Sequence, residues 1–280
     1  MIEIWWLYHV TAVLIGLVIG SFANVAILRL PDDRSLLPGS ACPRCGAPVR
    51  PRDNIPVVSW VILRGKCRDC AAPIPPTYPL VELLGGLLAF LVWRRFVPGP
   101  AQLDAAHLVA AALYFALVMD LVIAAYSDVR RRIIPDQTSS WAVPVAILGV
   151  VALGALGYDG PLAISWRASV VGAALAGCAL GIVAWAAGWL TGGEALGWGD
   201  VKLFALLGAA LGAVPGAFVV LLIASLTGAA GGLVGIAVVR RRIWLPFGPS
   251  LAFGGIVYVL WGEALARTFV PGLALLTSGR

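Results

Sequence analysis

Charged residues are scarce in this chain of 280 residues. Only 12% of the residues are Asp, Glu, Lys or Arg, against about a quarter in soluble globular domains, and 60% are hydrophobic. A chain with so little charge cannot cover a folded surface with polar groups. This shortage therefore excludes an ordinary water-soluble domain and favours a membrane protein.

Long apolar runs stand where charge is missing. A helix needs roughly 20 apolar residues to cross a bilayer, and several runs reach that length. The runs are Trp5–Leu28, Leu80–Trp93, Ala105–Ala125, Trp141–Leu156, Ala168–Leu190, Val201–Val214, Ala217–Val239 and Leu251–Ala266. We predict an all-α polytopic membrane protein with about eight transmembrane helices. The two shortest runs must recruit flanking residues, or lie tilted or partly buried.

Two further absences bear on the class of protein. Met1–Val10 contains no Lys or Arg, and no small-residue cleavage site follows the first run, which argues against a secretory signal. We therefore predict a retained first transmembrane helix over 1–28, a polar module over 29–78 and a membrane-embedded domain over 79–280. No internal repeat is evident.

Lys and Arg residues indicate the orientation. With eight spans, the loops 29–78, 127–140, 191–200 and 240–250 lie on one side, and with Lys202 they hold 15 of the 20 Lys and Arg residues. The positive-inside rule places these loops in the cytoplasm and both termini outside. The net charge of +6 reflects this bias and gives no sign of nucleic-acid binding.

The polar module contains two Cys-x-x-Cys pairs, Cys42 with Cys45 and Cys67 with Cys70. Four thiolates at this spacing suit a closed, tetrahedral Zn²⁺ site that would hold together a module too small to fold unaided. A pair of disulfides is the alternative, but cytoplasmic thiols stay reduced. Unliganded thiols are a third reading. The fifth cysteine, Cys178, lies in an apolar run and is predicted to be a packing residue.

Most acidic residues lie in loops or near the ends of runs and are predicted to be solvated. This group comprises Glu3, Asp32, Asp33, Asp53, Asp69, Asp104, Asp136 and Asp159. Asp120 differs because it falls inside the third apolar run, where an ionisable group is expensive and is functional by default. The others near or within runs are Glu82, Glu194 and Glu263.

Asp128 and Asp200 stand out by their topology. Asp128 ends the third run and Asp200 begins the sixth, so both are expected at the same membrane depth on the cytoplasmic side. Two carboxyls brought close share a proton and activate a water molecule, which is aspartic-protease chemistry. Gly197 and Gly199 leave a narrow backbone beside Asp200. The alternative is an Asp placed near a helix N-terminus, where the helix dipole favours negative charge.

Several ordered blocks of this sequence resemble those of the type IV prepilin peptidases, membrane aspartic proteases of the Gly-x-Gly-Asp class. The blocks are "GSFANVAILRLP" (20–31), "NIPVVSWVILRGKC" (54–67) between the cysteine pairs, "YPLVELLGG" (78–86), "SDVRRRIIPD" (127–136), "GEALGWGDVKL" (193–203) and "PFGPSLAFGG" (246–255). The fourth and fifth blocks resemble those that carry the family's catalytic aspartates. The resemblance therefore implies that Asp128 and Asp200 form the catalytic dyad.

The resemblance also implies a substrate and a second activity. Such enzymes lie in the bacterial inner membrane and remove short, positively charged leaders from prepilins and pseudopilins, for type IV pili or type II secretion. They cut after a glycine at the cytoplasmic face, and the apolar helix that begins the mature chain lies in the bilayer. Bifunctional members, typically those with the four-cysteine module, then methylate the new N-terminus with S-adenosylmethionine. The chain has no methyltransferase fingerprint of its own, so this activity rests on the resemblance.

Two other functions compete with this one. A Gly-x-Gly-Asp protease for another substrate class, such as preflagellins, would generally lack the cysteine module. A proton-coupled transporter that used Asp120, Asp128 and Asp200 as a relay should show internal repeats and broken helices at mid-membrane, and no repeat is evident here. Within the favoured function, Glu82 and Glu194 are candidates for orienting substrate or the methyl donor, and Asp120 has no assigned partner.

Overall fold

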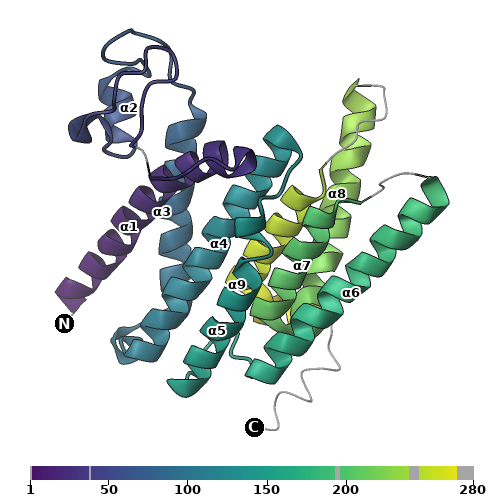
Figure 1. Cartoon of the computed structure of the whole chain (residues 1–280). Helices are drawn as coiled ribbons and strands as arrows, with labels where there is room; N and C mark the ends of the chain where they lie inside the picture. Colours follow the sequence, from purple (N-terminus) through teal and green to yellow (C-terminus); the bar gives the residue numbers. More distant parts are fainter. Residues whose placement is uncertain (1, 38, 193–195, 240–245, 270–280) are drawn as a thin grey trace. The chain divides into compact units, whose positions relative to one another are not determined.

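A computed structural model describes residues 2–37, 39–192, 196–239 and 246–269 (Figure 1). This part of the chain is helical. Its only β-structure is two isolated bridges. Its helices are α1 (Ile2–Arg29), α2 (Val58–Ile62), α3 (Thr77–Phe96), α4 (Ala105–Arg131), α5 (Ala142–Ala155), α6 (Trp166–Thr191), α7 (Trp198–Leu211), α8 (Phe218–Val239) and α9 (Gly248–Phe269). The chain divides into two compact units, Met1–Pro100 and Ala101–Arg280.

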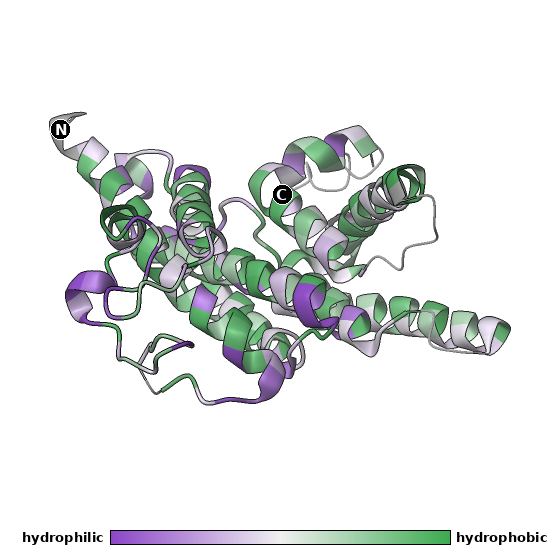
Figure 2. Ribbon diagram, turned by 90° about the horizontal axis from the view of Figure 1, so that it is seen from above, coloured by the Kyte–Doolittle hydropathy of each residue, from purple (hydrophilic) through white to green (hydrophobic). Residues whose placement is uncertain are grey.

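Six stretches of the described chain are long and apolar enough to cross a membrane. Five correspond to α1, α4, α5, α6 and α9. The sixth, Trp198–Val238, runs through α7, a π-helical turn (η5, Gly212–Ala217) and α8, and the backbone at Val214 is extended. Apolar residues predominate along these helices (Figure 2). The prediction of an all-helical, multi-pass membrane protein is confirmed. The number of about eight spans stays a prediction, because α3 is not among the six candidate spans.

The apolar runs became helices because only a helix pairs its own backbone N–H and C=O groups, as a bilayer requires. The short run at Leu80–Trp93 recruited flanking residues at both ends, as expected, to form α3. The third run extended furthest, since α4 continues to Arg131. Asp128 therefore lies inside the last turn of α4, where the helix fixes the direction of its side chain.

In the first unit, α1 and α3 touch along their backbones. A Cβ atom on Gly20 would lie 2.8 Å from the Cα atom of Glu82, so only glycine permits this approach. One turn further on, Asn24 donates a hydrogen bond to the carbonyl of Tyr78, 3.0 Å away. These contacts fix α1 against the start of α3, the two helices between which the cysteine module is inserted.

In the second unit, polar side chains are satisfied across helix pairs. Ser169 of α6 donates to the carbonyl of Ala209 of α7 at 2.6 Å, and Tyr114 of α4 donates to the carbonyl of Ala210 at 3.3 Å. Helix α9 packs against α4 and α8. Helices α4, α7 and α9, which carry the residues of the candidate active site, are thus held by packing and by hydrogen bonds within one unit.

Candidate active site and four-cysteine site

The four cysteines of the module meet at one point. Each can offer a sulfur atom, and the four sulfurs lie within 4.8 Å of one another, with Cys42 and Cys70 Sγ 3.8 Å apart. Tetrahedral coordination at a Zn–S distance of about 2.3 Å places sulfurs about 3.8 Å apart. The donor set and its spacing therefore fit one structural Zn²⁺ ion, and all four thiols are free, not joined in disulfides.

Both cysteine pairs sit in turns of the same design. In the first turn, the backbone N–H of Cys42 donates to the carbonyl of Ala47. In the second turn, the N–H of Cys67 donates to the carbonyl of Ala72, so the same contact recurs 25 residues further along the chain. Hydrogen bonds from the backbone of Cys45 lower the pKa of the Cys42 thiol to about 6. The backbone N–H of Ala72 lowers the pKa of Cys70, but desolvation and the neighbouring thiols raise it to about 12. The thiol of Cys42 is thus more acidic than that of Cys70, and a bound Zn²⁺ would hold all four sulfurs as thiolates.

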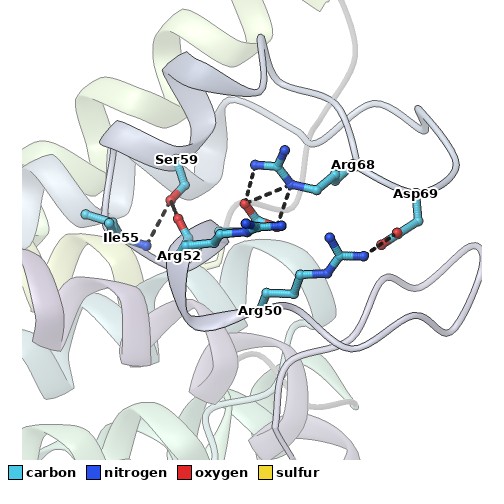
Figure 3. Close-up of polar contacts among 7 residues, drawn as sticks. Arg50, Arg52, Ile55, Ser59, Arg68 and Asp69 are labelled. Atoms are coloured by element: carbon cyan, nitrogen blue, oxygen red, sulfur yellow. Dashed lines mark hydrogen bonds and ion pairs between the residues drawn. The ribbon is translucent and has the colours of Figure 1, made fainter.

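Two ion pairs join the second turn to residues 50–53, the segment that follows the first turn (Figure 3). Arg50 pairs with Asp69 at 3.0 Å, and Arg68 forms a two-pronged contact with Asp53 at 2.6 and 2.8 Å. The side chain of Asp53 is only 9% exposed. Its hydrogen bond to Arg68 lowers its pKa and raises that of the guanidinium. The prediction that Asp53 is a simple solvated group is therefore wrong.

A cavity of about 850 Å³ lies in the first unit, between the module and helices α1 and α3. Cys42 and Cys67 line it, together with Trp60, Tyr78 and Glu82. Glu82 is buried and accepts a hydrogen bond of 2.7 Å from the backbone N–H of Val57. Val57 has φ of +63°, which is costly for a β-branched residue, so the backbone here is strained.

In the second unit, Asp128 lies in the last turn of α4 and is 7% exposed. Its Oδ2 atom accepts a hydrogen bond of 3.1 Å from the backbone N–H of Gly248, the first residue of α9. A Cβ atom at Gly248 would lie 2.5 Å from this oxygen, so a larger residue would force the carboxyl or the backbone to shift. A backbone donor at a helix start thus holds the carboxyl in place.

Asp200 lies in the first turn of α7 and is also 7% exposed. Its Oδ1 atom is buried and has no hydrogen-bond partner among the described residues. The protein thus buries two carboxyls at helix ends, and one oxygen of Asp200 has no partner among those residues.

Ile134 ties the two carboxyls to one location. A Cβ atom on Gly199 of α7 would lie 3.0 Å from the Cβ of Ile134, and one on Gly248 of α9 would lie 3.0 Å from its Cδ1. The segment after α4 therefore packs against the starts of both helices. Gly199 serves by its small size, in line with the narrow backbone that the sequence predicts beside Asp200.

Several other predicted residues have different surroundings from those expected. Lys202 pairs with Asp136 at 2.6 Å, so Asp136 is not simply solvated. Asp104 caps α4 by accepting from the N–H of His107, and this contact lowers its pKa. Cys178 is exposed on α6 and not packed. Glu3, Glu194 and the positions 240–245 lie outside the residues whose side chains are described.

Sequence reasoning missed Gly248 and Ile134. The only signal was that each stands in a block set apart by its similarity to known peptidases, "PFGPSLAFGG" and "SDVRRRIIPD". A glycine that donates through its backbone has no side-chain chemistry to reveal it. A sequence pattern therefore marks the segment without indicating the contact.

Comparison with known proteins gives consistent matches over most of the chain. Residues 14–96 match the bacterial peptidase A24 N-terminal domain, and residues 115–233 match the type IV leader peptidase family. The chain is 37% identical to a prepilin leader peptidase/N-methyltransferase of Aeromonas hydrophila, covering 95% of this chain and 94% of the relative. It is 34% identical to one of Pseudomonas aeruginosa, covering 92% of each. No solved structure matches.

Proposed function

Since the chain belongs to the type IV leader peptidase family, and is thus a membrane peptidase with relatives named prepilin leader peptidase/N-methyltransferase, we propose that it cleaves prepilin or pseudopilin leaders with Asp128 and Asp200. One observation carries the assignment of the dyad. Two buried carboxyls, distant in sequence, lie at helix ends that pack around Ile134, and Asp200 Oδ1 has no hydrogen-bond partner among the described residues. Such an arrangement suits activation of water.

The proposed reaction needs one ionised and one protonated carboxyl. The ionised carboxylate takes a proton from a water molecule, whose oxygen attacks the scissile carbonyl carbon. The protonated carboxyl donates a hydrogen bond to the carbonyl oxygen as negative charge develops there. When the C–N bond breaks, a proton passes to the leaving amine. The dyad works as a unit, and the hydrogen bond from Gly248 keeps Asp128 oriented throughout.

We place this chemistry at the cytoplasmic face of the inner membrane. Arg130, Arg131 and Arg132 begin two residues after Asp128, and the positive-inside rule puts such a cluster in the cytoplasm. A substrate with a charged leader and an apolar mature segment would present its scissile bond at that interface. The bilayer is therefore a partner in binding, because it confines the substrate to the depth of the carboxyls.

For the second activity, we propose that S-adenosylmethionine binds in the cavity of the first unit. It would supply a methyl group to the new N-terminal amine. Trp60 and Tyr78 offer aromatic faces, and buried Glu82 offers a carboxylate for a cationic group. The strain at Val57 is consistent with a binding role, because strained backbone gathers at functional sites. Zinc at Cys42, Cys45, Cys67 and Cys70 would hold one wall of this cavity.

One assay tests both activities. The purified protein in detergent is incubated with a prepilin and S-adenosylmethionine, and product masses are recorded. We expect loss of the leader and, on the mature product, the mass gain of one methyl group. Intact prepilin would refute the proposed peptidase function, and cleaved but unmethylated product would refute the second activity alone.

A further inference from the structure

A second cavity, of about 340 Å³, lies between α4, α5 and α7. Its walls are apolar and include Leu117 of α4, Val145 of α5 and Leu206 of α7. This volume falls within the range of small ligand sites. Among the few polar groups that line it are Asp120 and Gln137.

Asp120 is the anomaly in this cavity. Its Oδ2 atom is buried and has no hydrogen-bond partner among the described residues. Tyr114, which lines the same cavity, has its hydroxyl satisfied by the carbonyls of Leu162 and Ala210. A carboxyl in a membrane helix is expensive, and an unmade hydrogen bond adds to that cost. A hydrogen-bond donor from outside the described chain would remove the penalty.

Two of the cavity's walls, α4 and α7, are the helices that also carry the proposed dyad. Asp120 precedes Asp128 by eight residues on α4, which is about 12 Å at 1.5 Å per residue. Leu206 follows Asp200 by six residues on α7, which is about 9 Å. Gln137 marks the near end, because its neighbour Asp136 is paired with Lys202 in the first turns of α7. Along these helices, the distance from the carboxyls to the cavity corresponds to about three or four residues of an extended chain.

We propose that the cavity binds the first residues of the mature segment, on the C-terminal side of the scissile bond, in an extended conformation. In this arrangement Asp120 accepts a hydrogen bond from a substrate backbone N–H. An extended chain rises about 3.3 Å per residue, so 12 Å corresponds to the third or fourth residue after the cleaved bond. This inference rests on the proposed peptidase function and adds a specificity site to it.

The chemistry of an unwound peptide favours this occupant over a lipid tail. A peptide bond must leave the helix to be cleaved, and the unwound residues then carry unpaired N–H groups at membrane depth. An acceptor inside an apolar cavity meets that need. A hydrocarbon chain has no donor and would leave Asp120 unpaired. The charged leader, in turn, does not suit apolar walls, which assigns the cavity to the mature side.

Kinetics test the hydrogen bond. Asp120→Leu should lower kcat/KM for a prepilin about tenfold, the scale of one hydrogen bond to a carboxyl, while Asp120→Asn, which keeps an acceptor oxygen, should lose less. The loss should appear mainly in KM if the bond forms on binding. Thr227→Val is the matched control, because the Thr227 hydroxyl bonds only within its own helix α8. Unchanged kinetics for Asp120→Leu would overturn the proposal.

Proline substitutions in the substrate separate substrate binding by Asp120 from a purely structural role. If the role were only structural, the effect of a substrate proline on the cleavage rate would not depend on Asp120. Proline removes one backbone N–H at a time over mature positions two to six. At the third or fourth position, proline should slow cleavage by the wild-type protein, with no further loss in Asp120→Leu. Losses that simply add at every position would show that Asp120 does not accept from the substrate.

Photocrosslinking tests the location separately from catalysis. A benzophenone amino acid at Val145, which lines the cavity, should crosslink to the first mature residues of a prepilin bound to Asp128→Asn protein. The same probe at Val151, on α5 but not lining the cavity, should not. Crosslinks to lipid alone, or none, would overturn the cavity assignment. Cleavage that persists in Asp128→Asn would instead count against the dyad, because the crosslinks can still be mapped on the product.

Discussion

The backbone N–H of Gly248 donates a hydrogen bond to the carboxylate of Asp128, although the two residues are 120 positions apart. The contact joins the end of α4 to the start of α9. It orients one of the two proposed catalytic carboxyls with a donor that has no rotatable side chain. A larger residue at this position would displace the carboxyl or the helix start, because a Cβ atom would lie 2.5 Å from the carboxyl oxygen.

Gly248→Ala should therefore reduce cleavage about 5- to 150-fold, since shifting the carboxyl or the helix start costs on the order of 1–3 kcal/mol. Initial rates of prepilin cleavage measure the effect. Gly232→Ala is the matched control on α8, where an added Cβ meets nothing within 4 Å. Equal activity in both variants would contradict the orienting role of Gly248.

Asp128→Asn and Asp200→Asn should each lower cleavage at least about 100-fold, because an amide cannot exchange a proton with water. Asp120→Asn should be milder, since Asp120 lies outside the proposed dyad. Product masses report cleavage, and thermal melting in detergent confirms that each variant is folded. Asp159→Asn, in an exposed loop, is the control. Near-normal cleavage by either of the first two variants would exclude that residue from the dyad.

Replacing Cys42 or Cys70 by Ser should release zinc and loosen the module, because metal binding and folding of such a site are linked. Methylation should fall more than cleavage, since the cavity shares residues with the metal site whereas the proposed peptidase carboxyls need no metal. Elemental analysis and the ratio of methylated to cleaved product measure both effects. Cys178→Ser should change neither. Purified wild-type protein without metal but with free thiols would refute the zinc site.

The Asp53–Arg68 pair predicts a pH dependence of the module. The hydrogen bond from Arg68 lowers the folded-state pKa of Asp53 below its unfolded value of about 3.9. The pair therefore stabilises the module above about pH 4 and stops doing so as pH falls through the lowered pKa. Hydrogen exchange in residues 50–70 should be faster in Asp53→Asn than in the wild type at pH 7. The difference should vanish in strong acid, and a difference that grew as pH fell would contradict this account.

The sequence by itself determined the helical, multi-pass class and the four-cysteine motif. Both follow from local properties. A run of about 20 apolar residues has no stable alternative to a helix in a bilayer, and two Cys-x-x-Cys turns carry their ligand geometry within a few residues. Asp128 and Asp200 were singled out by a simple topological argument, that helix ends on one side of a membrane share a depth. Their catalytic role stays a prediction.

Tertiary structure alone decided which groups meet each carboxyl. Gly248 of α9 donates a hydrogen bond to Asp128. Asp53 forms an ion pair with Arg68, and Asp136 forms one with Lys202. The cavity beside Asp120 also exists only because α4, α5 and α7 pack as they do. These contacts depend on helix packing between segments distant in sequence, and backbone donors and missing Cβ atoms leave no chemical signature in the residues themselves. Periodicity and composition therefore predict the elements but not their partners.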